Sequence, residues 1–161
     1  MSRRMHAMTT GRRLVVVAVL VLGIVGPASA GASAPHGARS DLAFVDTMMF
    51  DTSIKGFTKA ATTGDTWFDW STDGCSAPLV GNTGRSFDFT AACHRHDFGY
   101  RNLRRLEDRY GVDDWNSATR KQVDQQFRAD MRAHCHGRSI LLRPTCYAWA
   151  QTFYAAVRFA G

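Results

Sequence analysis

The sequence predicts an all-α fold, a compact disulfide-stapled helical domain over residues 41–161 in which two long antiparallel helices carry the candidate site. Apolar residues recur at steps of three and four through this region, and the period-two alternation of strands is nowhere sustained. The chain has four cysteines, an even number that suits disulfides. A short turn, VDDWNS, separates the two longest periodic stretches, so these helices are expected to run antiparallel.

The first 30 residues are expected to be a secretory signal peptide. Four arginines and no acid accompany an apolar run at residues 14–25, and small residues follow at Ala28 and Ala30. The run is too short for a membrane span, which needs about 20 residues. We therefore expect cleavage after Ala30, secretion to the extracellular space, and no transmembrane segment after signal removal.

Removing this segment weakens any argument from charge. The net charge of +6 on the whole chain falls to +2, because four arginines and no acid leave with the signal. So small a charge does not favour a nucleic-acid partner. The remaining basic run on the first long helix is expected to be a solvated face, part of which could meet anionic lipid head groups; its members are Arg101, Arg104, Arg105 and Arg109.

Short elements are expected before the long helices. Residues 31–40 are small and polar and predict a flexible N-terminus. Residues 41–60 favour short helices, which Gly56 and Gly64 are expected to break. Residues 71–87 are rich in Gly, Pro and Asn and predict an irregular loop.

Three longer helices are expected, over about residues 91–108, 117–134 and 146–159. Gly111 follows the end of the first. Residues suited to capping precede the first two helices: Asp88 or Thr90, and Asn116 or Ser117.

The candidate chemistry is concentrated in the segment CHRHDFGYRN of the first long helix. Cys93, His96 and Tyr100 share one helical face, and Asp97 lies beside it. Neighbours on a helix point about 100° apart, so His96 and Asp97 suit two adjoining tasks rather than a mutual pair. An imidazole can take a proton from water near neutral pH, which suits His96 to the role of general base.

Asp124 lies at the inner edge of the second long helix, beside its apolar stripe. It could hold the His96 imidazole in the required tautomer, as an aspartate does in a catalytic triad. The alternative is an exposed acid that pairs with Arg120 or Arg128 four residues away. Tyr100 could be a core residue whose hydroxyl is satisfied by an acid.

Ester hydrolysis also needs positive charge for the developing oxyanion. A hard cation held by oxygen ligands would supply it, and the available ligands are Asp97, Asp73 and the backbone carbonyl of Gly74. Zinc is the weaker alternative, since the spacing of the nearby histidines fits no common ligand pattern; these are His94, His134 and His136, and we expect them on the surface.

Four cysteines allow three disulfide pairings. We favour the local one, in which Cys75 bonds Cys93 and Cys135 bonds Cys146. The first of these would tie the 71–87 loop to the helix one turn before Asp97.

The stretches FDWSTDGCS, AACHRHDFGYRN and VDQQFRADM resemble the secreted phospholipase A2 enzymes of bacteria and fungi, over roughly residues 67–159. The resemblance implies calcium-dependent hydrolysis of the sn-2 ester of a glycerophospholipid at a membrane or micelle surface, by a small secreted monomer. It implies that His96 activates water and that Asp124 orients the His96 ring. It implies that Asp73, Gly74 and Asp97 bind calcium.

The sequence departs from this family at Gly74, where an apolar side chain is expected. Glycine keeps the carbonyl but gives the loop more freedom, so calcium affinity could fall. A lipid-binding or calcium-binding module without catalysis is the alternative function. Four aromatic residues are expected to line an acyl channel: Trp67, Phe87, Phe98 and Phe127.

Overall fold

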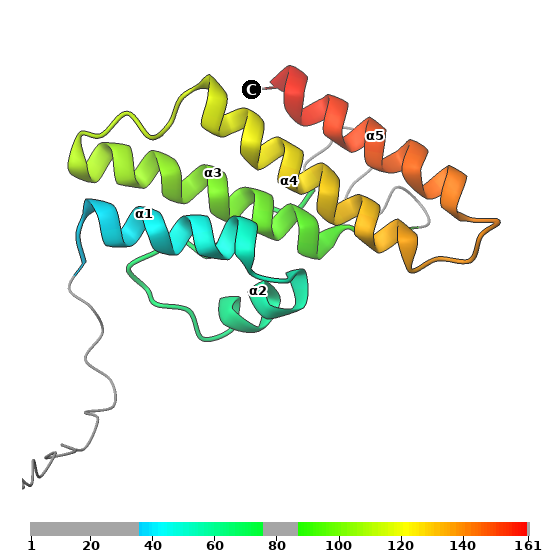
Figure 1. Ribbon diagram of the computed structural model, residues 1–161, viewed down its shortest axis with the longest axis horizontal. Helices are drawn as coiled ribbons and strands as arrows, with labels where there is room; N and C mark the ends of the chain where they lie inside the picture. The colour runs from blue at the N-terminus through cyan, green and yellow to red at the C-terminus, as the bar shows by residue number, and fades with distance from the viewer. Residues whose placement is uncertain (1–35, 76–86, 161) are drawn as a thin grey trace, which may run out of the picture. The chain divides into compact units, whose positions relative to one another are not determined.

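The computed structural model describes residues 36–75 and 87–160, and helices are the only regular elements in those ranges. Figure 1 shows α1, α3, α4 and α5 lying side by side in that order, with α3 and α4 antiparallel. The helices are α1 (Ala38–Asp46), the π-helical turn η1 (Thr47–Asp51), α2 (Ile54–Ala61), α3 (Thr90–Tyr110), α4 (Ser117–His136) and α5 (Arg143–Ala160). The all-α prediction is confirmed.

The predicted signal peptide lies outside the described residues. The predicted flexible N-terminus is wrong at its C-terminal end, because α1 already begins at Ala38. His36 is fixed by a ring stack on Trp67 and by an ion pair with Asp41. Within the described ranges, none of the helices combines the length and apolar character that a membrane crossing requires.

The start of α3 differs from the prediction. Its N-cap is Phe89, with no side-chain cap hydrogen bond, and not Asp88 or Thr90.

Other ends of the long helices follow the residues that the sequence indicates. Gly111 ends α3 in the left-handed conformation, with φ of 66°. Asn116 forms a capping box with Thr119 at the start of α4. The last helix begins three residues before its predicted start, because Pro144 is tolerated in a first helical turn, where its missing N–H is not needed.

The prediction that Gly56 breaks a helix is wrong. Gly56 lies inside α2, and its N–H donates to the side chain of Ser53, which caps that helix. The interruption between helices therefore falls before Ser53, between η1 and α2. Gly64 follows the end of α2, as expected, and packs against the Trp70 ring so closely that a Cβ there would meet it at 2.3 Å.

Two apolar clusters flank α3. One joins α3 to the N-terminal elements and includes Val45, Met49, Phe57, Phe98 and Leu106. The other joins α3, α4 and α5 and includes Phe89, Phe127, Met131, Ala150 and Phe153.

Gly99 allows the close packing of α3 against its neighbours. A Cβ at Gly99 would lie 2.8 Å from the sulfur of Met49 and 3.1 Å from a methyl group of Val123. A side chain at this position would require Met49 and Val123 to shift, so glycine suits the close packing of α3 against η1 and α4.

Both predicted disulfides are present. Cys75 bonds Cys93 and Cys135 bonds Cys146. The first fastens the loop before residue 76 to the first turn of α3, and the second joins the end of α4 to the start of α5. Because all four cysteines are oxidised, thiolate ligation of zinc is excluded.

Asp41 is a buried acid whose hydrogen bonds should stabilise the fold. It accepts from Tyr110, Trp67 and His36. Burial acts to raise the pKa of Asp41, but these three donors outweigh it, so the pKa lies below its ordinary value of 3.8. The charged form is therefore favoured by folding.

Replacing Asp41 with Asn is expected to lower the free energy of unfolding by about 1–3 kcal/mol at neutral pH. The stabilisation from a depressed carboxyl pKa is complete above the unfolded-state pKa and is lost as the pH falls through the folded-state pKa. Urea unfolding of both proteins at pH 7 and at pH 3 would check this. A difference between the proteins that does not shrink in acid would contradict it.

Candidate active site

The centre of the site is a buried carboxylate with three donors. Asp124, on α4, is fully buried, and His96 Nε2 lies 2.9 Å from its Oδ1. The Tyr100 hydroxyl donates to the same oxygen at 2.8 Å. His96 and Tyr100 are one turn apart on α3, so the predicted shared face is confirmed.

A residue that the sequence did not indicate completes this cluster. Arg158, near the end of α5, donates to Asp124 Oδ2 at 2.7 Å. The predicted alternative partners of Asp124, Arg120 and Arg128, are not its ion-pair partners in the described structure, and Arg128 instead lies over the Tyr154 ring. The sequence held one indication of this contact: α5 contains no acid, so Arg158 could find a carboxylate partner only on another element.

These contacts determine which groups carry protons. Burial acts to raise the pKa of Asp124, but hydrogen bonds from His96, Arg158 and Tyr100 outweigh it, so the pKa is lowered. Burial, then the bond to Asp124, raises the pKa of Tyr100 to about 12. An ionised carboxylate only accepts hydrogen bonds, so His96 Nε2 carries a hydrogen and Nδ1 holds the lone pair.

The imidazole is held in place by rings as well. The Tyr100 ring centroid is 4.4 Å and the Phe127 centroid 4.8 Å from that of His96. His96 retains only 9% of its exposure. The nitrogen that does not face Asp124 therefore lies in a confined space, where a small molecule can be held in one orientation.

Asp97 points to a second group of oxygens, in the loop before the disulfide. Its Oδ2 accepts from the Thr72 hydroxyl and from the Asp73 N–H at 3.2 Å. The Gly74 N–H donates to Thr72 Oγ1, and Gly74 has a φ of 74°. This is the left-handed region that favours glycine, so the turn requires Gly74 rather than merely tolerating it.

This second group suits a hard cation. Burial raises the pKa of Asp97, and the charge of Asp73 raises it further against the opposing bond from Thr72. A divalent ion bound between Asp97 and Asp73 would offset the repulsion between their negative charges. In residues 36–75 and 87–160, no group of three or more His, Cys, Asp or Glu side chains is arranged to hold a metal ion, so backbone carbonyls would have to complete the ligand set.

The basic run on α3 is exposed or half-exposed, as expected, but three of its four arginines also contact the preceding loop. Arg101 lies 3.5 Å from Asp73, and Arg105 lies 3.0 Å from Asp69. The Arg109 guanidinium stacks 3.8 Å above the Trp67 ring. These side chains fasten the preceding loop along α3, and they thereby set the position of Asp73.

Two of the three histidines that we expected on the surface are half-buried. His94 Nε2 lies 2.7 Å from the Trp70 carbonyl, and the His134 ring packs against Phe89. His136 alone is exposed, as predicted. His94 thus adds another link between α3 and the loop.

The expected acyl channel is wrong for two of its four residues. Phe87 and Phe127 share the cluster that borders His96. Phe98 is buried in the other cluster, and Trp67 packs there with its N–H bonded to Asp41. Phe98 follows His96 by two residues, which places it about 200° around α3, on the face that meets α2.

Comparison with known proteins indicates the family. The model of a family described as prokaryotic phospholipase A2 matches residues 45–161, a range that includes every residue of the candidate site. A secretory phospholipase A2 of Arthroderma benhamiae is 35% identical over 147 residues, which cover 88% of this chain and 94% of that protein. A secretory phospholipase A2 of Beauveria bassiana is 32% identical over 144 residues, covering 89% and 68%.

Proposed function

Since the chain belongs to the prokaryotic phospholipase A2 family, we propose that it hydrolyses the sn-2 acyl ester of glycerophospholipids with water activated by His96 and with bound calcium. It is a phospholipase A2, and phospholipids are its substrates. The observation that supports the His96 mechanism best is the 2.9 Å contact of Nε2 with a buried, ionised Asp124. This contact leaves Nδ1 as the basic atom.

In the proposed reaction, Nδ1 of His96 accepts a proton from a water molecule while the water oxygen attacks the ester carbonyl carbon. The carbon–oxygen bond to the glycerol then breaks. His96 returns the proton to the departing alkoxide, which gives a lysophospholipid and a fatty acid. Asp124 stays ionised throughout and stabilises the imidazolium.

Arg158 and Tyr100 act through Asp124. Each supplies one hydrogen bond to a carboxylate that would otherwise be costly to keep charged in a buried position. With both oxygens engaged, the carboxylate cannot rotate freely, and the ring of His96 keeps its direction. Both are positioning residues rather than groups that touch the substrate.

Asp73, Asp97 and the Gly74 carbonyl would hold the calcium ion. Bound there, calcium would polarise the ester carbonyl and neutralise charge on the phosphate. The chain's own contribution is the turn at Gly74 and two hydrogen bonds of Thr72, one donated to Asp97 and one accepted from the Gly74 N–H, which hold the two carboxylates close together. Among the described residues, no hydrogen bond is made to the Gly74 carbonyl, so it is available as a ligand.

Secretion as a monomer belongs to this proposal. The secretion itself is supported by the predicted signal peptide, by the two disulfides and by relatives that are named secretory. An oxidising compartment is where such bonds form and persist.

Removal of calcium tests the proposal directly. Fatty-acid release from phosphatidylcholine is expected to fall at least about 100-fold in excess chelator, because oxyanion stabilisation of this kind is worth that much. Added calcium should restore it, and circular dichroism should show that the helices persist throughout. Hydrolysis that is indifferent to chelator would contradict the calcium role. Calcium binding without product would favour the binding module instead.

A further inference from the structure

The connection between α4 and α5 presents three large aliphatic side chains to solvent. Ile140 is 75% exposed, Leu141 86% and Leu142 51%. The Cys135–Cys146 disulfide closes the base of this connection, so its shape is fixed without burying these side chains. Adjacent exposed aliphatics at one protruding turn mark a contact surface, whereas scattered single ones do not.

Positive charge surrounds these aliphatics. The last acid in the chain is Asp130, and arginines follow at Arg132, Arg138 and Arg143. The Arg138 guanidinium donates to His134, and Arg143 donates to the Arg138 carbonyl at 3.1 Å. In the described structure, none of the three arginines is within ion-pair distance of a carboxylate.

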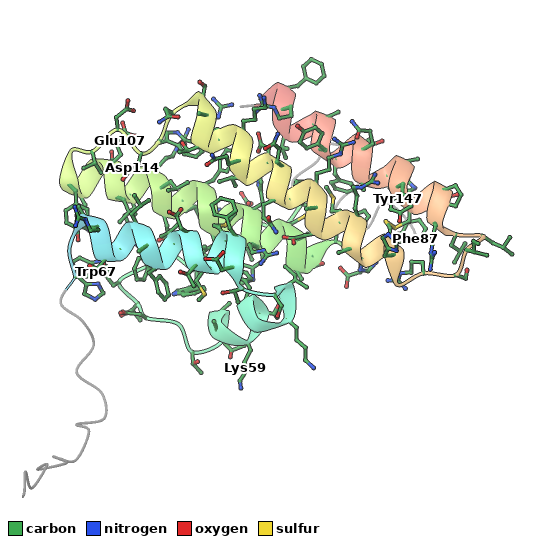
Figure 2. The ribbon with its side chains drawn as sticks, viewed as in Figure 1. Lys59, Trp67, Phe87, Glu107, Asp114 and Tyr147 are labelled. Atoms are coloured by element: carbon green, nitrogen blue, oxygen red, sulfur yellow. A yellow bond between two sulfur atoms is a disulfide. The ribbon has the colours of Figure 1, made fainter. Side chains whose placement is uncertain are left out.

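An aromatic ring and one acid lie near these arginines. The Arg132 guanidinium lies 4.8 Å from the Tyr147 ring centroid. Asp88 lies near enough for His134 and Arg138 to help lower its pKa, after its hydrogen bonds with Thr90. Figure 2 shows Tyr147 and Phe87 close to this end of the molecule and Lys59 on α2, away from it.

We propose that the α4–α5 tip, residues 138–143, inserts its three aliphatic side chains into an anionic phospholipid bilayer while its arginines meet the lipid phosphates. An apolar centre with a cationic rim is complementary to such a surface. A second copy of the chain is a poorer occupant, because two tips would bring arginines against arginines, and residues 131–161 contain no acid to pair with them.

The tip also stands in a fixed relation to the catalytic residues. Phe127, which packs against the His96 ring, precedes Cys135 on the same helix by eight residues, or roughly 12 Å along its axis. Anchoring the tip would therefore keep the site near the lipid surface. The inference rests on the proposed function, since it is the phospholipid substrate that gives the anchor a purpose.

Vesicle binding tests the proposal without hydrolysis. His96→Gln in the mature chain is the background, and the probe is vesicles of phosphatidylcholine with or without phosphatidylglycerol. Changing Ile140, Leu141 and Leu142 together to Ser is expected to weaken binding to the anionic vesicles by roughly 100-fold or more. Arg138→Gln with Arg143→Gln should weaken it about fivefold for each charge.

Matched controls come from exposed residues elsewhere. Phe159→Ser removes a side chain that is 93% exposed near the end of α5, and Lys59→Gln removes a charge on α2. Neither should change vesicle binding. Thermal unfolding should show unchanged stability for the triple Ser variant and both controls, whose altered side chains are exposed. The double Gln variant loses the hydrogen bonds of Arg138 and Arg143, so its vesicle binding should be measured at a temperature where it is fully folded.

Anionic-vesicle binding that survives the triple Ser change would overturn the proposal. So would a triple Ser variant that changes from dimer to monomer while its lipid binding is unaltered, since the tip would then be an interface between copies. With His96 restored, the tip variant should still hydrolyse a water-soluble short-chain phosphatidylcholine. Failure of the wild type in that assay would count against the proposed function and not against the tip.

Discussion

Replacing His96 with Gln is expected to lower the turnover rate of fatty-acid release by about 10²–10⁴-fold, the usual contribution of a general base. Glutamine has about the right size and can still bond to Asp124, but it cannot accept a proton from water at neutral pH. The loss should therefore appear in kcat, with KM little changed. Steady-state hydrolysis of a defined phosphatidylcholine with saturating calcium would measure it.

His136→Gln is the matched control, because His136 is an exposed histidine in the last turn of α4. It should keep full activity. If the His96 variant retained more than about a tenth of the wild-type rate while the protein stayed folded, general-base catalysis by His96 would be wrong.

Replacing Asp124 with Asn is expected to reduce turnover by about 10³–10⁴-fold, through the tautomer of His96. The amide nitrogen can donate to Nε2, which would move the ring hydrogen to Nδ1 and leave no base facing the water. The change also removes the negative charge that Arg158 pairs with, so some loss of stability is expected. Activity should be compared at a temperature where unfolding measurements show both proteins fully folded.

Asp108→Asn provides the control, as it neutralises an exposed acid near the end of α3. It should alter neither rate nor stability measurably. Arg158→Lys should keep part of the activity that Arg158→Met loses, because an ammonium can still bond one oxygen of Asp124. Equal activity in Asp124→Asn and wild type would remove Asp124 from the mechanism.

Local chemistry made much of the fold predictable. The capping box at Asn116 and the left-handed Gly111 each depend on residues no more than four positions away in the sequence. Both helix ends fall where these residues indicate. The start of α2 was missed because the decisive bond joins Ser53 to the N–H of Gly56, and glycine is normally taken as a breaker. The hydrogen bond from the Gly56 N–H to the Ser53 side chain outweighs the low helix propensity of glycine there.

The candidate site divides in the same way. His96, Tyr100 and Asp97 follow from helical geometry, and the contact of His96 with Asp124 follows from two antiparallel helices. Arg158 could not be placed, because its position depends on how α5 packs across α4. The tertiary packing of Phe98 and Trp67 was hidden for the same reason, since periodicity gives a face but not the neighbour it meets.

Because the bond between Cys75 and Cys93 holds the loop of the proposed ion site against α3, the ion affinity of this site should depend on whether the surrounding compartment is oxidising. Thiols are kept reduced inside most cells, so a newly made chain would lack the covalent link between the turn with Asp73 and the helix with Asp97. The two acids would then have to be brought together against chain entropy, and affinity for the ion would drop. We expect the producing cell to be spared from digestion of its own lipids until the protein has been exported and oxidised.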